Sequence, residues 1–128
     1  MKSLVISMQN TLLSEAIAKS FMDTGTFRIE QVLPGKTEDT LSYCCAMQAD
    51  VLLMEVSRLG AYTLENRLRL TDRVRQELPG CQCALLCDEN SDEELARRVK
   101  IARQDHRIDA FFYTSVTPGY LTAAVEAM

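Results

Sequence analysis

The hydrophobic residues of the chain fall into short continuous runs that alternate with segments of helical spacing. The clearest run lies within residues 49–56, where the apolar residues 51–54 are followed by a single carboxylate, Glu55. A run this short, bounded by polar segments, predicts a strand that is buried on both faces, as in the centre of a parallel sheet. Functional groups gather at the carboxyl ends of such strands, so Glu55 is a candidate functional residue. The alternative, that Glu55 only marks the return to solvent, stays open at this stage.

Four other segments have the composition of strands. They are residues 3–7, 27–33, 81–87 and 108–113. Residues 27–33 alternate between apolar and polar side chains, which indicates a less buried strand. Residues 81–87 become continuously apolar toward their end, and this predicts a strand buried on both faces.

Helices are predicted between these strands and after the last one, because apolar residues recur there at helical spacing. Asn10 or Thr11 can cap the first helix, and Gly25 can end it in the left-handed conformation. Ser91 and Glu94 form a capping box at the start of the fourth helix. The other expected starting residues are Thr37, Thr63 and Thr117, the last of which is followed by Pro118.

This alternation of strands and helices determines the expected fold. Strands separated by helices cannot form hairpins, so they pair in parallel through right-handed crossovers. We therefore predict an α/β fold of three layers, with a doubly wound, parallel five-stranded sheet in the flavodoxin-like order 2-1-3-4-5. The length of 128 residues predicts one domain, 1–128.

Composition and charge exclude several classes of function. The hydrophobic share of 47% and the charged share of 25% are those of an ordinary globular domain, and a formal net charge of -4 argues against an extended nucleic-acid surface. We expect the arginines of the third helix to be exposed and partly paired with Glu65, Asp72 or Glu77 along that helix, with nucleic-acid contact as a minor alternative. These arginines are Arg67, Arg69, Arg73 and Arg75.

The chain lacks signals for a membrane or a disulfide framework. No segment approaches the roughly 18 apolar residues of a membrane span, and no cleavable signal pattern is present, so we predict a cytoplasmic protein. Five cysteines without framework spacing fit a reducing compartment, and with one histidine and no CxxC pair we expect no metal site and no cofactor. Cys87, near Glu55, is the thiol most open to oxidants, although an adjacent carboxylate would raise its pKa.

Two segments resemble the receiver domains of two-component response regulators, which have the CheY-like form of this fold. Asp50-Val51-Leu52-Leu53-Met54-Glu55-Val56 is similar to the third strand of that family, which ends on the phosphorylated aspartate. Residues 110–121, which include Thr117-Pro118, resemble the fifth strand and last helix of the subgroup that precedes a helix-turn-helix DNA-binding domain. The resemblance spans the whole chain in the order and length of its segments.

The residues that carry phosphoryl chemistry in this family differ here. The resemblance implies two acids at the end of the first strand for Mg²⁺, an aspartate at the end of the third, a serine or threonine at the end of the fourth, and a lysine at the end of the fifth. In this chain the corresponding positions are Ser7, Met8 and Gln9, then Glu55, Cys87 and Thr114. A pocket with one carboxylate is a poor Mg²⁺ site, and phosphoryl transfer depends on the metal and on positioned cations. We therefore expect a degenerate pocket, with Glu55 at the acceptor position, in a pseudo-receiver that is not phosphorylated and is not an enzyme.

Such a domain would act through other proteins. We expect Glu55 to be solvated or hydrogen bonded to Thr114, Ser57 or Ser7, in a constitutive form that binds a second copy or another signalling protein. By resemblance, Tyr113 and Tyr120 are interface candidates. DNA would be contacted only through a C-terminal domain, and the chain is either the N-terminal part of a longer regulator or a stand-alone one.

Two other functions stay open at the level of the sequence. The first is a flavodoxin-like ligand-binding or enzyme domain, although residues 7–11 lack the glycine of a phosphate-binding loop. The second is a purely structural dimerisation module with an idle pocket.

Overall fold

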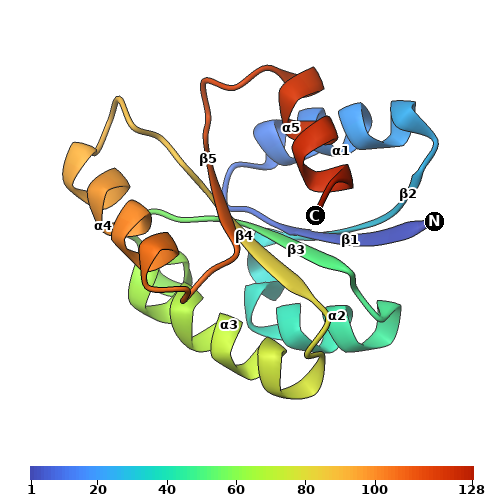
Figure 1. The fold of residues 1–128 in the computed structure, drawn as a ribbon, viewed down its shortest axis with the longest axis horizontal. Coiled ribbons are helices and arrows are strands. Elements are labelled where there is room, and N and C mark those ends of the chain that lie inside the picture. Colours follow the sequence, from blue (N-terminus) through green and yellow to red (C-terminus); the bar gives the residue numbers. More distant parts are fainter.

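The computed structural model describes residues 1–128 and contains five parallel strands in the order β2-β1-β3-β4-β5. Helices α1 and α5 cover one face of the sheet, and α2, α3 and α4 cover the other (Figure 1). The predicted fold is confirmed. The elements are β1 (Lys2–Ser7), α1 (Thr11–Thr24), β2 (Phe27–Val32), the 3-10 helix η1 (Pro34–Asp39), α2 (Thr40–Met47), β3 (Val51–Glu55), η2 (Gly60–Tyr62), α3 (Leu64–Glu77), β4 (Gln82–Cys87), α4 (Glu93–Gln104), β5 (Ala110–Tyr113) and α5 (Pro118–Glu126).

Each face of the sheet buries its own hydrophobic core. Val5, Leu52 and Leu85 point toward α2, α3 and α4, whereas their neighbours Ile6 and Leu53 point toward α1 and α5. This alternation follows from the period of two residues in a strand, and because both faces are covered, the central strands are almost wholly apolar. The edge strand β2 is only partly buried, as its alternating pattern predicted.

Most helix starts agree with the sequence. Asn10 caps α1 by accepting a hydrogen bond from the Leu13 amide (3.0 Å), and Gly25 ends that helix with φ of 71°. Thr63 and Thr117 cap α3 and α5. Short polar side chains at these positions satisfy amides that the first helical turn leaves unpaired. No helix of the structure combines the length and the apolar composition needed to cross a membrane.

Two predicted helix starts were wrong. The cap of α4 is Asp92 rather than Ser91, because the Asp92 carboxylate accepts from the Leu95 amide at 3.0 Å. The second helix begins at Thr40 rather than at Thr37, which lies inside the preceding 3-10 helix η1. Pro34 at the start of η1 supplies the fixed φ of a first helical position, so the chain turns earlier and in a tighter geometry.

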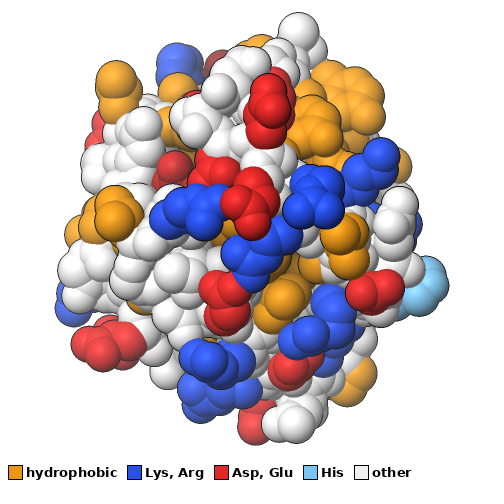
Figure 2. Space-filling model, turned by 90° about the vertical axis from the view of Figure 1, so that its left-hand side faces the viewer, with side chains coloured by type: hydrophobic (Ala, Val, Ile, Leu, Met, Phe, Trp, Pro, Cys, Tyr) orange, Lys and Arg blue, Asp and Glu red, His pale blue; other side chains and the backbone are white.

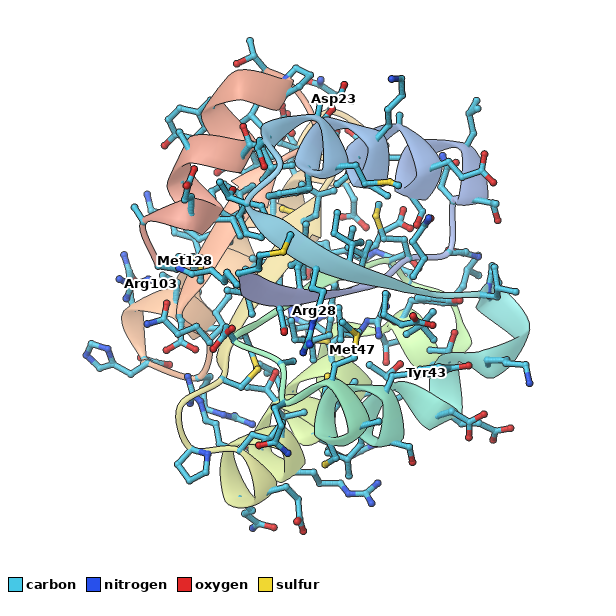
Figure 3. All side chains as sticks on the ribbon, turned by 90° about the vertical axis from the view of Figure 1, so that its right-hand side faces the viewer. Asp23, Arg28, Tyr43, Met47, Arg103 and Met128 are labelled. Carbon is cyan, nitrogen blue, oxygen red and sulfur yellow. The ribbon has the colours of Figure 1, made fainter.

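At the amino ends of the strands, polar side chains form hydrogen bonds with backbone groups. Asp50 accepts from the Ser3 amide and Asp109 from the Cys83 amide, each at 2.8 Å. Figure 3 shows Arg28 of β2 pointing toward Met47 at the end of α2, where it donates to the Met47 carbonyl at 3.0 Å. The polar groups at the amino ends of the strands are thus paired with backbone groups of neighbouring strands and of α2.

The predicted exposure of the α3 arginines was wrong for one residue, since Arg67 is only 1% exposed. The pairing along α3 was also wrong. Glu65 pairs with Arg98 of α4, and Asp72 pairs with Arg107 after α4 at 3.3 Å. Acidic and basic side chains therefore interleave on the face formed over α3 and α4 (Figure 2). In the folded chain, Arg98 and Arg107 lie closer to these two acids than the arginines of α3 do.

Candidate functional site

A cavity of about 320 Å³ opens at the carboxyl ends of β3 and β4. The strand register places Glu55 beside Leu86, and Cys87 beside Tyr113, so the ends of β3, β4 and β5 lie side by side. Both Glu55 and Thr114 line this cavity. The residues at its rim include Ser57, Arg58, Asp88, Ser91 and Asp92.

The Glu55 carboxylate is bound by backbone amides rather than by hydroxyl groups. Its Oε1 atom accepts hydrogen bonds from the amides of Gln9 at 2.7 Å and Asn10 at 3.0 Å. These amides lie in the loop that begins α1, where unpaired N–H groups and the helix dipole favour an anion. The expected hydrogen bonds to Thr114, Ser57 or Ser7 are not formed, because the glutamate side chain is long enough to reach this loop.

The last residue of β1, Ser7, and the two residues after it contact other parts of the fold. Ser7 is fully buried, with its hydroxyl 3.3 Å from that of Thr40, and Met8 is 1% exposed in the core beneath α1. Gln9 accepts from the Ser57 hydroxyl at 3.2 Å. None of them brings a carboxylate to the cavity. No group of three or more His, Cys, Asp or Glu residues is arranged to hold a metal ion.

Arg67 is the residue of this site that the sequence reasoning missed. Its guanidinium lies under the ends of β1 and β3 and donates to the Glu55 carbonyl (2.9 Å), the Ser7 carbonyl (2.9 Å) and the Ser7 hydroxyl (3.1 Å). Burial lowers the pKa of Arg67 to about 10, an effect that Tyr62 and Glu55 oppose, so the group stays a cation at neutral pH. A signal was present, because Leu64, Arg67, Thr71 and Val74 recur at the spacing of one buried helix face.

A hydrogen-bonded chain extends from Arg67 to the segment before α2. The Ser7 hydroxyl accepts from Arg67, and the Thr40 hydroxyl donates to the Thr37 carbonyl at 2.6 Å, so Ser7 must donate to Thr40. The Arg67 guanidinium also lies 4.8 Å from the centre of the Tyr62 ring, whose hydroxyl is 2.7 Å from that of Thr37. Stacking and hydrogen bonds together satisfy a cation that has no carboxylate in contact.

Cys87 does not line the cavity. It is 1% exposed and packs in the core on the side of α3 and α4. Burial, followed by the charges of Glu89 and Asp88, raises the pKa of Cys87 to about 11, and burial raises that of Cys44 to about 12. Thiols with such values stay protonated at neutral pH and are weak nucleophiles. The carboxylates near Cys87 are therefore not Glu55, as the sequence suggested, but those of the loop after β4.

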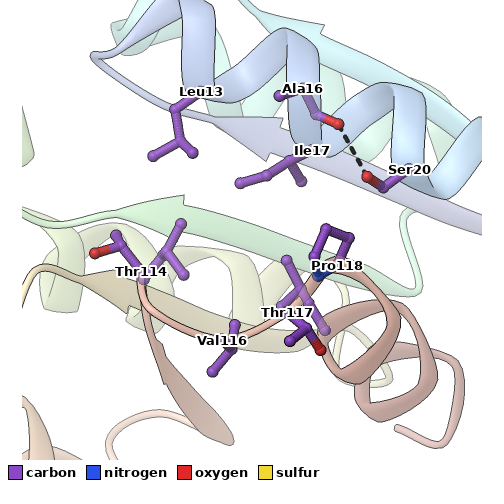
Figure 4. A pocket seen from close by; sticks show the side chains of 10 residues that line it. Leu13, Ala16, Ile17, Ser20, Thr114, Val116, Thr117 and Pro118 are labelled. Carbon is purple, nitrogen blue, oxygen red and sulfur yellow. Dashed lines mark hydrogen bonds between the residues drawn. The ribbon is translucent and has the colours of Figure 1, made fainter.

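Two further hollows adjoin this end of the sheet. One, of about 230 Å³, lies between α1 and α5, with Leu13 and Ile17 on one wall and Val116 and Pro118 on the other (Figure 4). The second is an open hollow of about 530 Å³ beside β5 and the start of α5, lined by aromatic residues that include both interface candidates. Tyr113 is half-buried there and Tyr120 is 60% exposed.

Comparison by sequence finds no matching family model and no matching curated protein. Comparison by structure finds close likeness to response-regulator proteins. A LuxR-family DNA-binding response regulator from Staphylococcus aureus matches with a TM-score of 0.75 at 16% identity, over 99% of this chain and 98% of that one. A CheY-like receiver domain protein from Methanospirillum hungatei matches with a TM-score of 0.72 at 15% identity, over 99% and 92%.

A third match comes from a family described as redox sensors in the streptococci that evolved from two-component response regulators. Its TM-score is 0.77 at 16% identity, and the alignment covers 99% of this chain but 50% of that one. At these identities the likeness establishes the fold. That fold is the one shared by response-regulator receivers, as the sequence resemblance implied.

Proposed function

We propose that this receiver-fold chain is a signalling domain that works without aspartyl phosphorylation and acts by binding another protein chain. In this proposal the domain is a pseudo-receiver whose pocket is held in one state by its own side chains. The observation that carries the proposal is the Glu55 carboxylate, which is bonded to the amides of Gln9 and Asn10.

This contact turns the Glu55 carboxylate toward backbone amides, and the cavity beside it lacks the ligands that a phosphoryl group and its metal would need. The carboxylate at the acceptor position is turned to the β1–α1 loop. The end of β1 and the start of that loop have Ser7, Met8 and Gln9 in place of acids. Mg²⁺ requires oxygen ligands in near-octahedral geometry, and phosphoryl transfer requires the charge compensation that such a metal gives. Thr114 supplies no cation at the end of β5.

Arg67 supports a fixed rather than a switching pocket. Its cation lies beneath the backbone of Glu55 and Ser7, so positive charge reaches the site from α3 instead of from β5. The two carbonyls and the hydroxyl that it binds belong to β1 and β3, the strands that carry the pocket. A shift of the strand ends relative to each other would have to break the hydrogen bonds of Arg67, of which those to Ser7 are buried, and this is costly.

The aromatic hollow beside β5 is the surface we propose for protein contact. Tyr113 and Tyr120 are joined there by Phe111 and Phe112. Of these four, Tyr120 is exposed, Phe111 and Tyr113 are half-buried and Phe112 is buried. Accessible aromatic side chains are enriched in the energetic centres of protein interfaces. DNA contact is assigned to a separate domain in this proposal, because the net charge of -4 does not favour phosphates.

The observations do not favour a redox role like that of the streptococcal neighbour. Four of the five thiols are buried, and the pKa is raised for Cys44, Cys83 and Cys87, so these lack the exposed thiolate that oxidants attack. Cys45 on α2 is the one partly exposed thiol, and it has no cysteine partner in a disulfide.

The test of the proposal is treatment with a small phosphodonor and Mg²⁺, followed by intact-mass measurement. We expect no added phosphoryl mass, while a receiver domain that accepts phosphate gains it under the same conditions. The Glu55→Gln variant, which keeps an oxygen for the two amides, is the matched control for any mass gained elsewhere in the chain. A stable phosphoryl group that appears on the parent chain and is lost in this variant would overturn the proposal.

A further inference from the structure

The cavity beside Glu55 and the groove between α1 and α5 adjoin each other. Leu86 at the end of β4 and Thr114 after β5 line both of them. Their volumes, about 320 Å³ and about 230 Å³, together lie in the range of roughly 300–1,000 Å³ that is typical of small-molecule sites. We call the wall that they share, at Leu86 and Thr114, the junction.

The two hollows differ in chemical character. The groove is lined mostly by apolar side chains, among them Leu13, Ile17 and Leu121. The cavity carries the carboxylates of Glu55 and Asp88 together with Asp92. Its one basic side chain, Arg58, is already paired with Asp92 and lies 3.6 Å from Glu94. Arg67 beneath Glu55 offsets part of the negative charge, but the three carboxylates outnumber Arg58 and Arg67. The cavity therefore favours a cation, and the groove favours a hydrocarbon chain.

One oxygen of Glu55 is free to bind such a cation. The Oε1 atom accepts both loop amides, whereas Oε2 makes no hydrogen bond in the structure. Asp88 likewise uses only Oδ1, which accepts from the amides of Asn90 at 3.0 Å and Ser91 at 3.3 Å. A metal ion would need several convergent ligands, and no group of three His, Cys, Asp or Glu side chains is arranged to hold one. An organic ammonium group does not need such a cluster. An ammonium group can donate up to three hydrogen bonds to such oxygens.

We propose that these joined hollows bind a small amphipathic ammonium compound, with its charged head beside Glu55 and its alkyl chain between α1 and α5. The inference goes beyond the proposed protein-binding function and assigns the pocket a ligand. Binding would join the β3 end to both α1 and α5, two helices that the apolar groove separates.

The test uses n-hexylammonium chloride as the probe and follows backbone amide chemical shifts during a titration. We expect saturable shifts at residues that line both hollows, such as Leu86 and Thr114. Hexanoate has the same chain with the opposite charge, and methylammonium has the same head without the chain. Each should bind about tenfold more weakly or worse, because each loses one of the two contributions.

Three variants locate the site. Glu55→Gln should weaken hexylammonium binding by about tenfold, because it removes the charge but keeps an oxygen for the two amides. Thr114→Lys should abolish binding, because its own ammonium group occupies the junction. Ala16→Phe should reduce binding by filling the groove. Glu77→Gln, an exposed residue at the far end of α3, is the control and should change nothing.

Two results would overturn the inference: hexanoate that binds as tightly as hexylammonium, or the lack of any saturable shift at the lining residues. Phosphoryl uptake is measured separately by mass. A chain that gained a phosphoryl group and still bound hexylammonium would refute the proposed function alone. A chain that gained no phosphoryl group and did not bind hexylammonium would refute this inference alone.

Discussion

At Arg67 a permanent cation is held away from water with no carboxylate in hydrogen-bonding contact. Carbonyl groups at the ends of β1 and β3, a serine hydroxyl and the ring of Tyr62 take the place of a counter-ion. Burying an ion in this way is favourable only when every donor finds an acceptor in good geometry. Removal of the cation would leave the acceptors unpaired in a dry environment, which usually costs more than the bonds themselves contributed.

We predict that Arg67→Met lowers the free energy of unfolding by about 2–4 kcal/mol, because buried acceptors lose their donor while the helix keeps a side chain of similar length. Urea unfolding followed by circular dichroism measures the change. Arg73→Met, at an exposed position of the same helix, is the matched control and should stay within about 0.5 kcal/mol of the parent chain. Equal effects of the two substitutions would show that the buried contacts do not stabilise the fold.

At the scale of secondary-structure elements, the beginning of α4 joins two parts of the fold. Asp92 caps the helix through the Leu95 amide and also pairs with Arg58 in the loop after β3. The hydrogen bond from Arg58, followed by that from the Leu95 amide, lowers the pKa of Asp92 from 3.8 to about 2. The ionised form is therefore favoured in the folded chain, and this link between β3 and α4 depends on pH.

The direction of that dependence follows from the lowered pKa. The stability contributed by ionised Asp92 is complete above its ordinary pKa of 3.8 and is lost as the pH falls toward about 2. We predict that Asp92→Asn, which keeps the capping oxygen, is less stable than the parent at pH 6, and that the difference shrinks between pH 4 and pH 2. Urea midpoints across this range measure it, and high salt should also reduce the difference, because the pair is partly exposed.

Glu93→Gln is the control for this measurement, since it changes an exposed acid in the same helical turn. Its urea midpoint should follow that of the parent across the same pH range. A gap between parent and Asp92→Asn that did not depend on pH would mean that the cap, and not the ion pair, accounts for the stability.

At the scale of the whole molecule, the two ends of the parallel strands differ. The amino ends are closed by hydrogen bonds, and the carboxyl ends are open. The amino ends of the strands are closed by Asp50 and Asp109, which accept from backbone amides, while the carboxyl ends carry the cavities. The aromatic hollow lies beside β5 and the start of α5, next to the carboxyl ends of the strands. A partner bound there would therefore contact the element next to Thr114, which lines the pocket.

We predict that Tyr120→Ser weakens self-association by about tenfold or more if the chain pairs with a second copy, because a large exposed aromatic side chain is lost from the proposed contact. Light scattering over a range of concentrations gives the mass. Met22→Ser is the matched control, since Met22 on α1 is 59% exposed, against 60% for Tyr120. A mass of one chain at every concentration would contradict the homodimer and leave a different signalling protein as the proposed partner.

The sequence by itself determined the order of the elements, the sheet topology and most helix starts. These depend on interactions between residues close in the chain, such as the cap from Asn10 to the Leu13 amide. The alternation of strands and helices then restricts the topology, because parallel strands require crossovers. The position of Glu55 at the end of β3 was also predicted correctly, because an apolar run followed by a carboxylate is recognisable in the sequence alone.

Only the tertiary structure decided what these side chains contact. Arg67 binds Ser7, which lies 60 positions earlier in the chain, and Glu55 binds amides of the β1–α1 loop, 45 and 46 positions away. An arginine on a largely polar helix carries no local sign of the acceptors that make its burial possible. The physical reason is that the energy of a buried polar group depends on which partners the folded chain brings within hydrogen-bonding distance, and that set is fixed by packing rather than by sequence neighbours.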